Sequence, residues 1–169
     1  MGQYYHICNL NKQQYLHPHK FGDGLKMLEF GSSGCGTMTA LAILLADGNG
    51  LGGGDLRSNN EIVGSWAGDR IVVAGDYAEA NRWGLEGKKD GDGNDLTLYA
   101  ACENWEDISD KVIEAMSDDS YLCQVLAERA GRGSPGKENA PGLYAARERA
   151  SREGLVERSP ASVTEKNKI

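Results

Sequence analysis

Three histidines and a cysteine near the start of the chain have the types and spacing that suit metal or acid–base chemistry. His6, Cys8, His17 and His19 all fall within the first predicted β-hairpin. If its turn centres between the eleventh and twelfth residues, facing residues have numbers that sum to 23, so His6 faces His17 and Cys8 faces Tyr15. Opposed side chains lie about 4.5–5.5 Å apart at Cβ, which would let His6, Cys8 and His17 share a transition-metal ion. The simpler alternative is a pair of structural imidazoles, so no cofactor is predicted.

A glycine-rich loop is the second candidate site. Residues 31–37 read Gly-Ser-Ser-Gly-Cys-Gly-Thr and lead into a predicted helix. Free backbone N–H groups and the positive end of a helix dipole favour phosphate or carboxylate, so Gly34, Gly36 and Thr37 are candidate ligand-binding residues. The loop lacks the Lys-Ser/Thr ending of a P-loop and the glycine order of a dinucleotide fingerprint. The alternative is a flexible turn that lets an apolar helix pack closely.

Cys35 in the same loop is a candidate nucleophile. A helix start lowers the pKa of a nearby thiol, and His17 or His19 would supply the base. The commoner role of a lone cysteine is a buried, inert side chain. A hydrolase-type enzyme that uses Cys35 or the His/Cys metal centre is therefore the rival hypothesis and not the first one.

Two aspartates bracket a predicted strand. Asp69 and Asp76 each follow an Ala-Gly pair, and the extended chain between them separates them by about 15 Å or more, too far for paired-carboxylate catalysis. We expect both to make turn hydrogen bonds. Together with the neighbouring Arg70 and Tyr77, they are also candidate ligand-binding residues.

The strands that would position these side chains follow from alternation and β-branched residues. Residues 4–9 and 14–17 predict a hairpin, and residues 61–66 and 70–74 predict a second one. The segment 25–30 fits either a strand or a short helix, and we expect a strand. The sequence therefore predicts an α+β fold whose antiparallel sheet is built from two β-hairpins plus a strand.

The predicted helices rest on composition and spacing. Residues 37–46 are apolar on nearly every face, which predicts a buried helix with Ser33 or Thr37 as its cap. Residues 96–103 fit a strand or a helix, and the apolar spacing from Ser109 predicts a C-terminal helical segment.

Charge divides the chain into two parts. Residues 1–130, the predicted single α+β domain, carry a net charge of −10, and residues 131–169 carry +3, which together give the −7 of the whole chain. The second part is a low-complexity, mildly basic tail whose composition predicts disorder, with a possible short helix at 144–153. Duplex nucleic acid is an improbable partner for the acidic domain, because phosphate neutralisation supplies most of that binding energy.

The cysteines and the N-terminal residues bear on location. The four cysteines are far apart and form no C-x-x-C pair, which indicates reduced thiols in the cytoplasm. No basic region followed by an apolar run is present near the start, and no apolar stretch is long enough for a membrane span. We expect neither a signal peptide nor a membrane partner.

Several sequence strings are distinctive in combination: MGQYY, HPHKFGDGLK, GGGDL, GSWAGDRI and AGDYA. With them the chain resembles an uncharacterised family of small bacterial and phage proteins over roughly residues 1–128. The resemblance implies no activity, cofactor or catalytic residue. The tail from Gly131 departs from the pattern.

No complete catalytic constellation can be assembled from these residues. The sequence therefore favours a small non-enzymatic binding or assembly protein. Its partner would be either a small anionic ligand at residues 31–37, or a protein or larger assembly docked through the tail.

Overall fold

The computed structural model describes residues 2–32, 36–47 and 60–118. In chain order, its elements are β1 (Tyr5–Asn9), β2 (Gln14–Leu16), a 3-10 helix (Pro18–Phe21), α1 (Met27–Gly31), α2 (Thr37–Leu45), β3 (Ile71–Gly75), α3 (Leu98–Cys102), β4 (Glu106–Asp107) and α4 (Ser109–Asp118). Strands and helices together make an α+β fold, as predicted. None of the helices in these ranges is long and apolar enough to cross a membrane.

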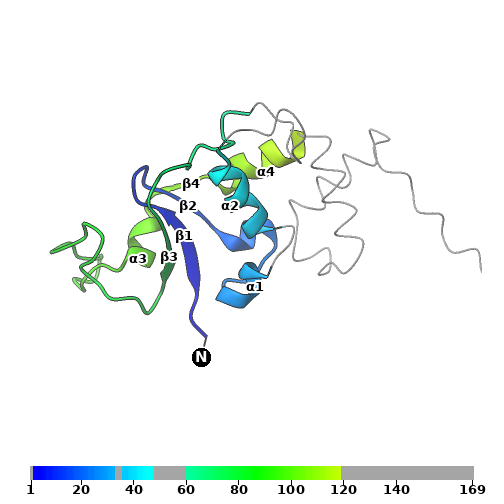
Figure 1. Cartoon of the computed structure of the whole chain (residues 1–169). Coiled ribbons are helices and arrows are strands. Elements are labelled where there is room, and N and C mark those ends of the chain that lie inside the picture. Colours follow the sequence, from blue (N-terminus) through cyan, green and yellow to red (C-terminus); the bar gives the residue numbers. More distant parts are fainter. Residues whose placement is uncertain (1, 33–35, 48–59, 119–169) are drawn as a thin grey trace, which may run out of the picture.

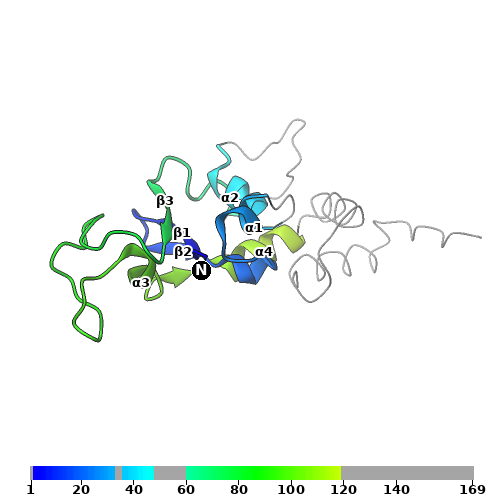
Figure 2. The same ribbon diagram turned by 90° about the horizontal axis from the view of Figure 1, so that it is seen from below.

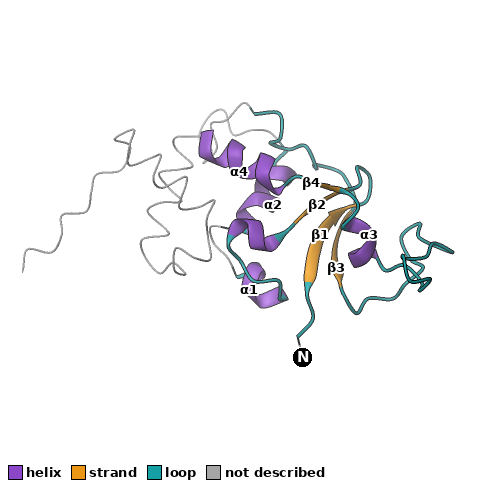
Figure 3. Ribbon diagram, turned by 180° about the vertical axis from the view of Figure 1, so that it is seen from behind, coloured by secondary structure: helices purple, strands orange, loops and turns teal. Residues whose placement is uncertain are grey.

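The strands form a four-stranded sheet in the order β3-β1-β2-β4. Strand β1 is antiparallel to both β2 and β3, whereas β2 and β4 run parallel. Helices α1, α2 and α4 lie on one side of the strands and α3 lies on the other (Figures 1 and 3). The sheet is therefore a central layer with β3 and β4 as its two edges.

Alternation along β1 and β2 divides the core between these two sides. Ile7 and Leu16 point toward the larger cluster, which includes Phe30, Leu44 and Trp66. The next pair along the two strands, Cys8 and Tyr15, points to the opposite face and packs against α3. The second cluster comprises Cys8, Tyr15, Ala74, Leu85, Leu98, Ala101 and Cys102. Side chains in a strand alternate between the two faces of a sheet. Both faces of the hairpin are buried because one cluster covers each of them.

The first hairpin forms in the predicted register. Cys8 pairs with Tyr15, and Ile7 pairs with Leu16. The turn is stabilised locally, since the Oδ1 atom of Asn9 accepts hydrogen bonds from the backbone N–H groups of Asn11 and Lys12. An asparagine that closes a turn in this way explains why a short polar sequence connects the two strands.

The buried helix is also confirmed, as α2. Its inward face carries Ala40, Ile43 and Leu44. The helix ends at Leu45 because the carbonyls of Ile43 and Leu44 accept from the backbone N–H groups of Gly64 and Trp66. The predicted cap Thr37 is instead the first helical residue, Gly36 precedes it, and Ser33 lies outside the described residues.

The predicted second hairpin is wrong. Residues 61–66 form consecutive turns, with bonds such as Ser65 N to Ile62 O and Ala67 N to Gly64 O. Gly64 has φ +70°, and a Cβ there would lie 2.5 Å from the carbonyl oxygen of Ala46, so no other residue fits. The apolar residues of this segment pack on the larger cluster without forming a strand.

The predicted strand at 25–30 is wrong as well, because α1 occupies residues 27–31. The Glu29 carboxylate accepts from the Lys26 backbone N–H at 3.1 Å, which closes the first helical turn. In the described residues the sheet therefore contains one hairpin, and the parallel pairing of β2 with β4 makes it mixed instead of antiparallel throughout.

The ambiguous segment 96–103 resolves to a helix, α3, which is capped by Thr97 through a hydrogen bond from Ala100 N. The helix expected from Ser109 is present as α4 up to residue 118. The Gly-rich residues 48–59, the residues after 118 that were expected to be helical, and the tail with its possible helix at 144–153 lie outside the described residues.

Candidate functional site

The start of α2, at the end of the glycine-rich loop, already has a carboxylate at its N–H groups. Both the backbone N–H and the hydroxyl of Thr37 donate to Oδ2 of Asp23, each at 2.7 Å. Gly34 and Cys35 lie outside the described residues, and Gly36 is buried. An anion binding at Thr37 would have to displace Asp23, so anion capture here stays a prediction and receives no added support.

The three histidine rings form a row that runs from the surface into the core beside α3. His19 is exposed, His17 is half-buried and His6 is only 2% exposed. The ring centroids of His6 and His17 lie 4.9 Å apart, and those of His17 and His19 lie 5.4 Å apart. His6 also stacks on Tyr99 at 4.3 Å. The predicted juxtaposition of His6 and His17 is thus realised in the structure.

His6, at the inner end of this row, is hydrogen-bonded to Cys102, which in turn interacts with the buried thiol of Cys8. The Nδ1 atom of His6 lies 3.3 Å from Sγ of Cys102, whose thiol donates to the Tyr99 carbonyl at 3.1 Å. His6 therefore donates from Nδ1 and keeps Nε2 as an acceptor. In the described part of the chain, His6 Nε2 and His17 Nδ1 are buried without a hydrogen-bond partner.

Burial sets the protonation states of this cluster. It lowers the pKa of His6 to about 4, with a smaller contribution from the nearby His17. The pKa of His17 is lowered too, first by burial and then by His19. The hydrogen bond with Cys102, together with burial, raises the pKa of Cys8. At neutral pH the two inner imidazoles are uncharged and Cys8 is a thiol.

The alternative metal site of His6, Cys8 and His17 gains no support from this geometry. Within residues 2–32, 36–47 and 60–118, no three His, Cys, Asp or Glu side chains are arranged to hold a metal ion. Cys8 interacts with Cys102 as a protonated thiol, whereas a metal ligand must be a thiolate. The cluster has the properties of a packed interior.

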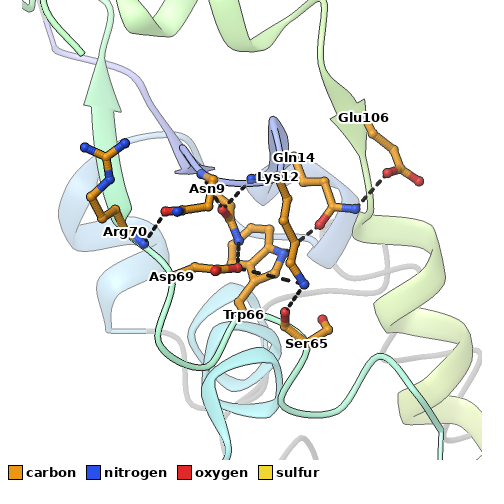
Figure 4. Close-up of polar contacts among 9 residues, drawn as sticks. Asn9, Lys12, Gln14, Ser65, Trp66, Asp69, Arg70 and Glu106 are labelled. Carbon is orange, nitrogen blue, oxygen red and sulfur yellow. Dashed lines mark hydrogen bonds and ion pairs between the residues drawn. The ribbon is translucent and has the colours of Figure 1, made fainter. Parts of the chain in front are cut away.

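Asp69 has a structural task at the hairpin tip (Figure 4). Its Oδ2 atom accepts from Nδ2 of Asn9 at 2.8 Å and lies 3.9 Å from Nζ of Lys12. The same lysine donates to the carbonyl oxygen of Ser65. Asp69 thereby satisfies the side-chain amide of a fully buried asparagine from another part of the chain, which differs from the expected hydrogen bond within its own turn.

The same network attaches both edge strands to the hairpin. Nε1 of the buried Trp66 donates to Oε1 of Gln14 at 2.8 Å, and Nε2 of Gln14 donates to Oε2 of Glu106 at 2.7 Å. The backbone N–H of Arg70 donates to Oδ1 of Asn11 at 2.9 Å. The tip therefore positions the entry to β3 and the start of β4 (Figure 4).

Among the residues that the structure describes, none forms hydrogen bonds with the outer edge of β3. Leu10 N donates to Arg70 O, and Asp76 N donates to Tyr4 O, both at 3.0 Å. In an antiparallel pair these bonds recur at every second residue, so the even-numbered residues 70–76 bond to β1 and the odd-numbered residues point their backbone groups outward. No residue in the described ranges bonds to the outward N–H and C=O groups of Ile71 and Val73. Figure 2 shows no described helix beyond this edge.

Three of the predicted ligand-binding residues lie at the ends of this edge strand. Arg70 precedes β3 and is exposed, while Asp76 follows it and accepts from Tyr4 N at 3.1 Å. Tyr77 is 68% exposed and Val73, in the middle of the strand, is 38% exposed. The sequence identified the flanking residues, but it carried no signal that β3 is an edge, because that depends on strand order.

Comparisons with known proteins add no relative to this description. No family model matches the chain, and no match was found among curated proteins or among solved structures. The family resemblance carried by the sequence strings therefore stays a prediction.

Proposed function

We propose that the protein is a non-enzymatic assembly protein that pairs the outer edge of β3 with an extended segment of a protein chain. The observation that carries the proposal is the row of outward backbone groups at Ile71 and Val73, which have no partner in the described part of the chain. Such an edge is a template for strand addition, because main-chain hydrogen bonds supply affinity and alternate side chains supply specificity.

The side chains of β3 support the same proposal. The strand reads Ile-Val-Val-Ala-Gly and contains no charge and no proline. Three β-branched residues in succession favour an extended backbone. The features with which proteins usually protect an edge, such as a central lysine, a proline or a bulge, are missing from β3.

The rival hydrolase-type enzyme has weaker support. Its proposed nucleophile, Cys35, lies outside the described residues, so no base can be assigned to it. The Cys102 sulfur has an imidazole 3.3 Å away, but its residue is completely buried, and a nucleophile needs access to substrate. The anionic ligand and the tail, as alternative binding routes, rest on the sequence alone.

The test uses the full-length chain and random peptides displayed on phage. Peptides are selected on the wild-type protein and, in parallel, on Val73→Pro, which removes one outward N–H, and on Val73→Lys, which introduces a charge at the edge. Residue-specific amide exchange of the complex then locates the binding site, with Val72 and Ala74 as internal controls because their N–H groups already bond to β1.

We expect peptides that bind the wild-type chain but neither variant, and that slow exchange at Ile71 and Val73 only. Peptides that bind all three proteins equally, or that leave those two amides unprotected, contradict the proposal. Val73→Lys keeps the test meaningful if the proline variant does not fold.

A further inference from the structure

We propose that the chain paired with β3 is β3 of a second copy, joined antiparallel about a twofold axis at Val73. This inference rests on the proposed function and names its partner. The structural basis is the position of two opposite charges, Arg70 and Asp76, at equal distances on either side of Val73 along the strand.

Hydrogen-bond geometry first limits the possible registers. The outward backbone groups belong to the odd-numbered residues, so an antiparallel copy pairs only when odd residues face odd residues. Val73 facing Val73 of the second copy satisfies this rule. Each Ile71 then faces Gly75 of the other copy, and a shift by one residue would place outward groups opposite groups already bonded to β1.

Charge then selects among the registers that remain. With Val73 on the axis, Arg70 of each chain faces Asp76 of the other chain, which makes two opposite-charge pairs. A shift by two residues in either direction places Arg70 opposite an alanine, at position 74 or 78, and both pairs are lost. Opposite charges that face each other across two strands stabilise pairing, and like charges oppose it.

The side chains fit this register. Arg70 and Asp76 lie at even positions and therefore on the same face of the sheet, where they can meet across the pair. On the other face, the two half-exposed Val73 side chains meet at the axis, and each Ile71 faces Gly75, which is covered by the side chain of Gln3 from its own chain. A twofold pairing of this kind closes the assembly at two copies, because each β3 edge is used once.

The experiment measures self-association of the full-length chain by sedimentation equilibrium. The proteins are the wild type, Arg70→Asp, Asp76→Arg, the double swap Arg70→Asp/Asp76→Arg, and an equimolar mixture of the two single variants. Asp76→Asn keeps the oxygen that accepts from Tyr4 N and serves as a second variant if Asp76→Arg does not fold. Circular dichroism verifies the fold of each.

We expect the wild type to dimerise and each single swap to raise the dimer Kd by about tenfold to thirtyfold, because two attractive pairs become two repulsive ones. The double swap restores the attraction, with the two charges exchanged. The equimolar mixture forms a heterodimer, since one chain then carries two acidic residues and the other two basic residues at the paired positions. Asp76→Asn weakens the dimer by only a few-fold.

Failure of this inference is distinct from failure of the proposed function. A wild-type chain that stays monomeric but takes up peptides along β3 overturns the second copy and leaves strand addition intact. A dimer whose Kd responds to none of the swaps uses another surface and also overturns the inference. A monomer that binds no peptide at β3 overturns both.

Discussion

The two edges of the sheet differ in how they limit pairing with other chains. Strand β4 has only two residues, Glu106 and Asp107, both acidic. Glu106 pairs with Lys111 at 2.5 Å, and Asp107 accepts from the backbone N–H of Ser109 at 2.9 Å as the chain turns into α4. Strand β3 has five residues, is uncharged and is exposed at its centre. Short, charged edges resist strand addition, so we expect pairing with another chain at β3 and not at β4.

The largest effect is expected when β3 receives a negative charge like those of β4. Val73→Glu places two carboxylates opposite each other at the dimer axis and removes the valine contact, so we expect the dimer Kd to rise about a hundredfold. Val73→Thr keeps the branched shape without a charge and is the matched control, with a change of only a few-fold. Sedimentation equilibrium measures both, and equal effects of Glu and Thr would argue against pairing at this position.

The second prediction concerns the buried histidine His6 in β1, which lies between the two edge strands. His6 has a pKa of about 4 in the folded chain against an ordinary value of 6.5, so the unfolded state binds more protons between these pH values. Stability is then retained above about pH 6.5 and lost as the pH falls toward 4, by about 3 kcal/mol. His6→Phe, which keeps a ring to stack on Tyr99, should flatten this limb of the stability curve.

Urea unfolding at several pH values checks the His6 prediction. His19→Gln is the matched control, because His19 belongs to the same row of histidine rings but is exposed. A His6→Phe protein that loses stability in acid as steeply as the wild type would show that other groups cause the loss. In the monomeric state none of these changes should alter exchange at the β3 edge.

The third prediction tests the hydrogen bond between Asn9 and Asp69, which lies just before β3. Asp69→Ala leaves the amide of the buried Asn9 without its 2.8 Å acceptor, so unfolding should become easier by about 1.5 kcal/mol. Asp69→Asn retains an acceptor oxygen and should cost less. Thermal unfolding checks both, and a cost that is equal for Ala and Asn would show that the charge, and not the hydrogen bond, matters.

The smallest effect is expected at the closed edge. Glu106→Gln removes the exposed ion pair with Lys111 but keeps an oxygen for Gln14, so stability should change by about 0.5 kcal/mol or less. The dimer Kd should stay the same, because β4 takes no part in pairing. A weaker dimer in this variant would place the interface at β4 and reverse the comparison.

Local features of this fold were predictable from the sequence, and features that depend on strand order were not. The hairpin register follows from a turn closed by Asn9, and α2 follows from an apolar run that is too long for a strand. Residues 61–66 contain two β-branched residues and resemble a strand in composition, yet consecutive turns pack Ile62 and Val63 against the larger cluster. Strand β4 has no β-forming residue at all and exists only because Gln14 and Tyr15 lie beside it.

The same distinction holds for the site. Asp76 was recognisable as an aspartate directly after glycine, and Arg70 and Tyr77 as the residues next to the two Ala-Gly-Asp corners. The facing of His6 and His17 followed from the turn. Which of them borders an open edge depends on the neighbours of β3 in the sheet. Asp23, which occupies the start of α2, also escaped prediction, because its partner Thr37 is reached only through the tertiary fold.

The parallel pairing of β2 with β4 also bears on how the chain is synthesised. Gln14 meets Glu106, a residue 92 positions later, so the ribosome must add most of the described domain before the sheet can be completed. Until then the free side of β2 has no strand partner, although β1 can already pair with β3, and closing so large a loop slows folding. The nascent hairpin therefore exposes its β2 side to solvent and chaperones for longer than a fold made of sequence-adjacent strands would.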